Sequence, residues 1–101
     1  MRSIRSFAKA RSRLSVNHKK IINQENDFLF SEKTKSAFEK ILQVSENKVL
    51  EIGFGEGDSL FEMAVNNPDI HFFGIEVYET GVARTCLKIE ESGIKNLKIY
   101  L

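Results

Sequence analysis

The sequence has a single cysteine, a single proline and no acidic residue among its first twenty positions. A lone cysteine, Cys86, cannot form an internal disulfide, so we expect a reducing compartment, the cytoplasm. No apolar run approaches the roughly 18 residues of a membrane span, and the N-terminus lacks the apolar segment of a secretory signal. These shortages argue against the secreted and the membrane-spanning classes of protein.

The lack of acids at the N-terminus divides the charge of the chain unevenly. Residues 1–20 carry a net charge of +7 and residues 21–101 carry −6, although the whole chain is at +1. A basic arm on an acidic body favours a polyanionic partner for the arm. Two other interpretations stay open at this point: a solvated tail, and a mitochondrial transit peptide, since the arm is rich in Arg and Ser.

Composition and pattern divide the chain into three segments. Residues 1–20 form the basic arm, residues 21–48 a linker with one helix, and residues 49–101 a domain that alternates apolar runs with amphipathic segments. Within the linker we expect a connecting loop over residues 21–30 and a helix over residues 31–42, with Ser31 as a candidate N-cap.

The third segment has the pattern of an α/β fold. The predicted strands are KVLEIGF, HFFGIEV and LKIYL, and the two predicted helices between them end near Pro68 and at Gly93. This β-α-β-α-β order predicts a parallel sheet with strand order 3-2-1. The first strand would be an exposed apolar edge, so we expect self-association or a partner chain.

A glycine-rich loop follows the first predicted strand. Gly53, Gly55 and Gly57 lack a Cβ atom, so the backbone can turn sharply and approach a ligand closely. The next helix directs its positive N-terminal end at the same place. Glu76 ends the second strand, 19 residues after Gly57. A carboxylate at that position can accept hydrogen bonds from both hydroxyls of a ribose.

The spacing of the glycines bears on the choice of cofactor. A dinucleotide site of the form G-x-G-x-x-G would need its third glycine at position 58, where Asp58 would repel a pyrophosphate. The pattern E-x-G-x-G-x-G, from Glu51 to Gly57, resembles motif I of the class I S-adenosylmethionine-dependent methyltransferases instead. That resemblance implies a Rossmann-like class I methyltransferase fold, here its first half only, and S-adenosyl-L-methionine as cofactor. A dinucleotide site remains a weaker alternative.

The cofactor implied by this resemblance has no phosphate and carries a cationic sulfonium and an ammonium group. Acids around the loop, namely Glu51, Glu56 and Asp58, are therefore compatible with it. Glu51 would face the methionyl end and Glu76 the ribose. A structural interpretation of Glu51, as a strand-end carboxylate paired with a local base, also stays open.

Two longer stretches resemble one particular family. The segment RSIRSFAKARSRL is similar to the N-terminal arm of the bacterial tRNA (guanine-N7)-methyltransferases. LEIGFGEGDSLFEMA, NPDIHFFGIEV and GVARTCLKIEESGIKNLKIY resemble the first half of their catalytic domain. The resemblance implies methyl transfer from S-adenosyl-L-methionine to N7 of a variable-region guanine in tRNA. It implies cofactor contacts at Glu51, Gly53, Gly55 and Glu76.

The same resemblance implies that the arm engages tRNA, with Arg2, Arg5, Arg11 and Arg13 as the expected RNA-binding residues. The catalytic domain of the family continues beyond the point that corresponds to residue 101. We therefore expect a truncated chain whose catalytic residues lie beyond residue 101. The alternative is a catalytically inactive remnant or an RNA-binding fragment of such an enzyme. No second His or Cys lies at ligand spacing from His18 or His71, so no metal site is expected.

Overall fold

The computed structural model describes residues 15–101, so the four arginines expected to bind RNA lie outside the described residues. Helices and strands alternate along most of this range. In chain order they are α2 (Val16–Asn23), β1 (Leu29–Phe30), a 3₁₀ turn (Glu32–Thr34), α3 (Lys35–Val44), β2 (Lys48–Ile52), α4 (Asp58–Asn66), β3 (His71–Ile75), α5 (Glu79–Ser92) and β4 (Leu97–Tyr100).

The four strands form one parallel sheet in the order β1-β4-β3-β2. Its β4-β3-β2 part confirms the predicted 3-2-1 order, and α4 and α5 supply the crossovers that parallel strands require. Within the described residues β2 forms one edge of the sheet, with the side chains of Leu50 and Ile52 43% and 73% exposed. The chain therefore has an α/β, Rossmann-like partial fold.

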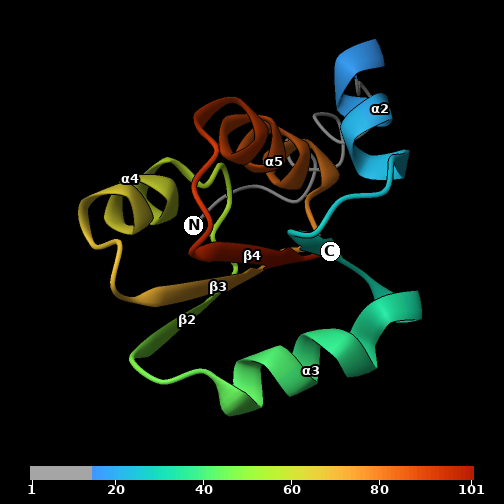
Figure 1. The fold of residues 1–101 in the computed structure, drawn as a ribbon. Helices are drawn as coiled ribbons and strands as arrows, with labels where there is room; N and C mark the ends of the chain where they lie inside the picture. Colours follow the sequence, from blue (N-terminus) through green and yellow to red (C-terminus); the bar gives the residue numbers. More distant parts are fainter. Residues whose placement is uncertain (1–14) are drawn as a thin grey trace.

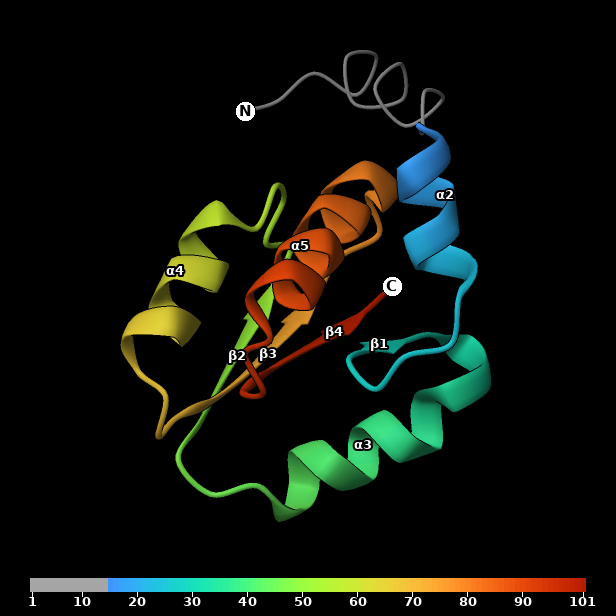
Figure 2. The ribbon, with the colours of Figure 1, turned by 45° about the horizontal axis from the view of Figure 1, so that its top comes forward.

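Helices cover both faces of this sheet (Figure 1). On the upper face in that view, α4 and α5 bury apolar side chains against β3 and β4, and Figure 2 shows α2 lying beside α5. The core on this face includes Leu60, Val82, Cys86, Ile89 and Ile99, all at most 2% exposed. Burial, with the charge of Glu90 adding to it, raises the pKa of the Cys86 thiol to about 12. Cys86 therefore stays protonated and fills the core.

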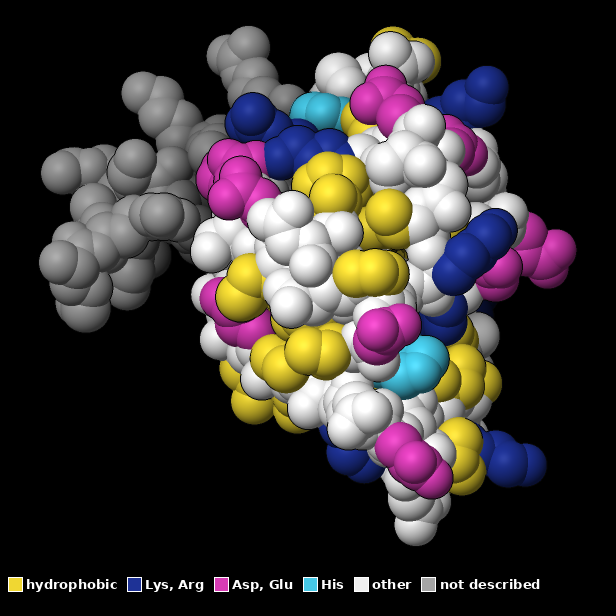
Figure 3. All heavy atoms as spheres, turned by 60° about the vertical axis from the view of Figure 1, so that its left-hand side comes forward, with side chains coloured by type: hydrophobic (Ala, Val, Ile, Leu, Met, Phe, Trp, Pro, Cys, Tyr) yellow, Lys and Arg dark blue, Asp and Glu magenta, His cyan; other side chains and the backbone are white. Residues whose placement is uncertain are grey.

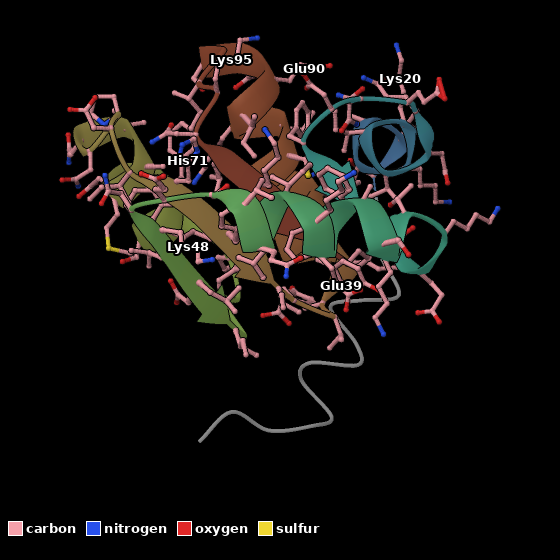
Figure 4. The ribbon with its side chains drawn as sticks, turned by 60° about the horizontal axis from the view of Figure 1, so that its bottom comes forward. Lys20, Glu39, Lys48, His71, Glu90 and Lys95 are labelled. Carbon is pink, nitrogen blue, oxygen red and sulfur yellow. The ribbon has the colours of Figure 1, made fainter. Side chains whose placement is uncertain are left out.

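The opposite face is covered by α3, which lies across the sheet in Figure 4. Phe38 is the one buried residue of α3, and its ring meets Phe73 edge-on at 5.8 Å between centroids and Tyr100 at 5.1 Å. Lys48, at the start of β2, donates from Nζ to the Leu42 carbonyl oxygen at 2.7 Å. This bond ties the end of α3 to the edge strand and satisfies one of the carbonyls left free at a helix C-terminus.

The linker differs from its prediction. Residues 21–30 are not a connecting loop, because they contain the end of α2 and the strand β1. The Asn26 side chain shapes the turn between them, since its Oδ1 accepts hydrogen bonds from the N–H groups of Phe28 and Leu29 at 3.2 and 2.8 Å. A strand of two residues is too short to show an alternating pattern, so β1 could not be recognised from the sequence.

The connection from α4 to β3 depends on one side chain. The Asn96 amide nitrogen lies 2.9 Å from the Ala64 carbonyl oxygen, 3.0 Å from that of Asn67 and 2.9 Å from that of Ile70. These carbonyls are at the C-terminal end of α4 and in the turn that contains Pro68, where helical partners run out. Asn96 thereby fixes where α4 ends and β3 begins.

Candidate cofactor site

The loop between β2 and α4 is shaped by three glycines. Gly53, Gly55 and Gly57 have φ angles of 76°, 69° and 80°, in the left-handed region that side chains disfavour. The Gly53 N–H donates to the Ile75 carbonyl oxygen at 2.7 Å, so the loop starts from a fixed point on the neighbouring strand. Gly57 is the N-cap of α4 and Asp58 its first residue.

The glycines of the loop face different surroundings. A Cβ atom added at Gly53 or Gly55 would meet nothing within 4 Å, whereas one at Gly57 would lie 1.9 Å from Thr85 Oγ1. Open space therefore borders the first two glycines, and α5 borders the third. The loop thus fits a ligand that lies against the backbone of Gly53 and Gly55, the two glycines predicted to contact a cofactor.

The aromatic residue of the loop anchors it to the core. Phe54 is half-buried and packs beside Leu60 over Gly74 in the middle of β3. A Cβ atom at Gly74 would lie 2.7 Å from Phe54 Cδ2 and 2.6 Å from Leu60 Cδ2. Gly74 therefore lets the phenyl ring sit close to the sheet, which holds the loop over the ends of β2 and β3.

Glu76 lies immediately beyond β3 and is buried, with 8% of its surface exposed. Its Oε1 accepts the Gly55 N–H at 2.6 Å, and its Oε2 accepts the N–H groups of Val77 and Tyr78, each at 3.0 Å. One carboxylate thus joins the glycine loop to the loop that leads into α5. A carboxylate offers about four acceptor positions, so one remains for a ligand hydroxyl. Sequence reasoning predicted the ligand contact and missed this backbone role.

Glu51 lies in β2, beside Gly74 of β3. It is half-buried, and no hydrogen bond or ion pair of its side chain occurs with any other residue in 15–101. The interpretation in which Glu51 pairs with a local base therefore has no support in this range. A half-buried carboxylate without a partner is suited to a cationic group of a ligand, because burial strengthens such a pairing.

The other two acids of the loop already have partners. Glu56 Oε1 lies 3.1 Å from Arg84 Nη1, and Asp58 forms an ion pair with Lys88, both bases being on α5. The hydrogen bond from Lys88 and its positive charge lower the pKa of Asp58. Glu56 and Asp58 therefore each neutralise a base of α5. These pairings could not be predicted from the sequence, because each joins a residue at the start of α4 or in the loop before it to a residue of α5.

Other kinds of site find no support in the described range. No group of three or more His, Cys, Asp or Glu side chains in residues 15–101 could hold a metal ion. Among the same residues, no helix combines the length and apolar character needed to cross a bilayer.

Comparison with known proteins identifies a methyltransferase family. Residues 45–101 match a family model described as "Putative methyltransferase". The chain is 41% identical over 101 residues to the tRNA (guanine-N(7)-)-methyltransferase of Actinobacillus pleuropneumoniae serotype 5b (strain L20) and 40% identical over 100 residues to that of Pasteurella multocida (strain Pm70). This chain belongs to the tRNA (guanine-N7)-methyltransferase family.

The two alignments cover 98% and 97% of this chain but 40% and 39% of those relatives. A third relative, the tRNA (guanine-N(7)-)-methyltransferase of Pseudoalteromonas translucida (strain TAC 125), is 37% identical. That alignment covers 99% of this chain and 42% of the relative. The chain thus spans about two fifths of the length of these relatives. The family resemblance that its motifs indicated is confirmed.

Replacing Glu76 by glutamine tests the backbone role of its carboxylate. In Glu76→Gln an NH₂ group replaces one carboxylate oxygen. It faces either the Gly55 N–H or the N–H groups of Val77 and Tyr78, and because it cannot accept their hydrogen bonds, those donors are left unsatisfied. We expect a loss of about 1–3 kcal/mol in the free energy of unfolding, measured by urea denaturation. Glu62→Gln, an exposed position on α4, is the control. A loss no larger than that of the control would contradict the role.

Proposed function

We propose that this chain carries the cofactor-binding part of a tRNA (guanine-N7)-methyltransferase, which transfers a methyl group from S-adenosyl-L-methionine to N7 of a variable-region guanine in tRNA. The observation that carries the proposal is the open space beside Gly53 and Gly55, bordered by the buried Glu76 carboxylate. Membership of the family supports the same cofactor and substrate.

The residues present fit the cofactor. Glu51 has no partner in the described range and would pair with the ammonium group, while Glu76 would accept from one ribose hydroxyl with the acceptor position that its backbone bonds leave free. The backbone of Gly53 and Gly55 would line the space between them. S-adenosyl-L-methionine supplies an electrophilic methyl group on a sulfonium.

The reaction makes modest demands on side chains. Guanine N7 carries a lone pair and no proton at neutral pH, so it needs no general base before attack. The main requirement of the reaction is an in-line arrangement of N7, the methyl carbon and sulfur. Binding both reactants in fixed positions provides this arrangement. Residues that hold the cofactor therefore contribute to the rate by positioning. No group of this chain is assigned as a catalytic acid or base.

The tRNA would be held by the basic arm. We propose that Arg2, Arg5, Arg11 and Arg13 contact phosphates, which would make tRNA binding weaken as salt concentration rises. These residues lie outside the described residues, so the support is the charge of +7 over residues 1–20 together with the family. A cytoplasmic location agrees with this role and with the single buried cysteine.

Calorimetric titration of the 101-residue chain with S-adenosyl-L-methionine tests the cofactor. We expect binding that Glu51→Gln weakens about tenfold or more, because a hydrogen-bonded charge pair is lost. Glu39→Gln, an exposed carboxylate on α3 at the opposite face of the sheet, should bind like the wild type (Figure 4). NADH should not bind. Binding of NADH in place of S-adenosyl-L-methionine would overturn the proposal in favour of a dinucleotide site.

A second candidate function is binding without catalysis, as an inactive remnant or an RNA-binding fragment. This chain aligns with about 40% of the length of two relatives, so the activity of those proteins is not shown for it. Adding labelled S-adenosyl-L-methionine and a tRNA transcript to the titrated chain separates the two. Label in N7-methylguanine supports the enzyme, and cofactor binding without transfer supports the binding fragment.

The edge strand suggests how the isolated chain behaves in solution. β2 presents unpaired N–H and C=O groups together with Val49, Leu50 and Ile52, which are 38%, 43% and 73% exposed. Figure 3 shows further hydrophobic side chains, in separate patches among charged ones, on the side where α4 lies. We propose that the 101-residue chain self-associates through β2.

Sedimentation velocity at tens of micromolar tests self-association. The wild type should sediment as dimers or larger species, and Leu50→Lys, which places a charge on the exposed edge, should shift it towards monomer. Val16→Lys, at a side chain on α2 that is 83% exposed, is the control and should leave the distribution unchanged. A wild type that stays monomeric at every concentration would contradict the proposal.

A further inference from the structure

Gly81 is buried near the start of α5, a helix of 14 residues. Glycine is, after proline, the least favourable residue inside a helix, because it has the most backbone entropy to lose. The backbone conformation does not require glycine at position 81, because Gly81 does not have a positive φ. In the part of the chain that the structure describes, the glycines with positive φ are Gly53, Gly55, Gly57 and Gly93. The reason must therefore lie in what surrounds Gly81.

The neighbour of Gly81 is the glycine loop itself. A Cβ atom at Gly81 would lie 1.9 Å from the Gly55 carbonyl oxygen and 2.9 Å from the Gly55 carbonyl carbon. Both are backbone atoms, so no side chain can rotate away to make room. Gly55 is held from its N–H side by Glu76, whose Oε1 accepts the Gly55 N–H at 2.6 Å. Gly55 is thus fixed between Glu76 and the backbone of α5.

The same face of α5 makes a second contact with the loop, one turn further on. Thr85 is fully buried, and its Oγ1 lies 3.2 Å from the Glu56 carbonyl oxygen and 2.8 Å from that of Gly81. Its side chain also occupies the place that a Cβ atom of Gly57 would need. Residues 81 and 85 are four apart and so lie on one helix face.

The ion pairs of this face matter less than its packing. Arg84 and Lys88 pair with Glu56 and Asp58, but three of these four side chains are more than a third exposed. Exposed ion pairs contribute little, because solvent screens them and ordering the side chains costs entropy. The close contacts at Gly81 and Thr85 therefore decide where the loop lies.

We propose that Gly81, with Thr85 beside it, is a positioning residue that holds the glycine loop in its ligand-binding conformation before any ligand arrives. The part of this proposal that concerns cofactor affinity rests on the proposed function. A loop held in advance does not have to be ordered by the ligand, and preorganisation of this kind raises affinity.

Amide hydrogen exchange of ¹⁵N-labelled wild type and Gly81→Ala tests the proposal without any ligand. Alanine suits a helix better than glycine does, so α5 itself should keep its protection, read at Val82 and Ile89. The displaced loop should lose the bond from Gly55 to Glu76, so the Gly55 amide should exchange at least tenfold faster. Glu91→Ala, an exposed position of α5 away from the loop, should leave Gly55 unchanged.

Titration with S-adenosyl-L-methionine adds the functional readout. In Gly81→Ala the dissociation constant should rise about tenfold while the amides of α5 keep their protection, a combination that general destabilisation of the fold would not give. A wild type that fails to bind would contradict the proposed function, and the exchange of Gly55 would still decide the role of Gly81. An unchanged Gly55 exchange rate in folded Gly81→Ala overturns the proposal.

A second variant covers the case in which Gly81→Ala does not fold. Thr85→Val keeps the shape of the side chain but removes the hydroxyl beside the Glu56 carbonyl. It should speed the exchange of Gly55 by a smaller factor, severalfold, and Thr85→Ser, which restores the hydroxyl, should return it towards the wild-type rate. If Thr85→Val exchanges like the wild type at Gly55, the positioning role of this helix face is overturned.

Discussion

The carboxylate of Glu76 is the constraint on which the site depends. It is buried and accepts three backbone N–H groups, one from the glycine loop after β2 and two from the loop after β3. Leaving these donors unsatisfied would be costly, because one of the three bonds is buried and the other two are partly buried. A single side chain therefore sets the distance between the two loops that border the proposed ligand space.

The glycines around the loop serve two different purposes, although they look alike in the sequence. Gly53 and Gly55 face open space and leave room for a ligand. Gly57, Gly74 and Gly81 instead let parts of the protein approach each other, respectively at Thr85, at Phe54 and at the Gly55 carbonyl. The space for the ligand exists because the chain packs tightly on the other sides of the loop.

The sequence predicted the parts of the fold that local pattern encodes. The three main strands, the two crossover helices and their parallel order followed from alternating apolar runs and from breakers such as Gly93. β1 could not be predicted, because its two residues become a strand only by pairing with Ile99 and Tyr100. Pairings across elements, such as Arg84 with Glu56, were equally hidden, since they depend on how α5 lies over the loop.

We propose that the ligand lies between the glycine loop and Glu76. Mapping backbone amide shifts of the ¹⁵N-labelled chain during addition of S-adenosyl-L-methionine tests it most directly. We expect the largest shifts at residues 53–57 and 76–78, while the amide shifts of α3 on the opposite face stay unchanged. Shifts centred on α3, or no shifts at saturating cofactor, would contradict this placement.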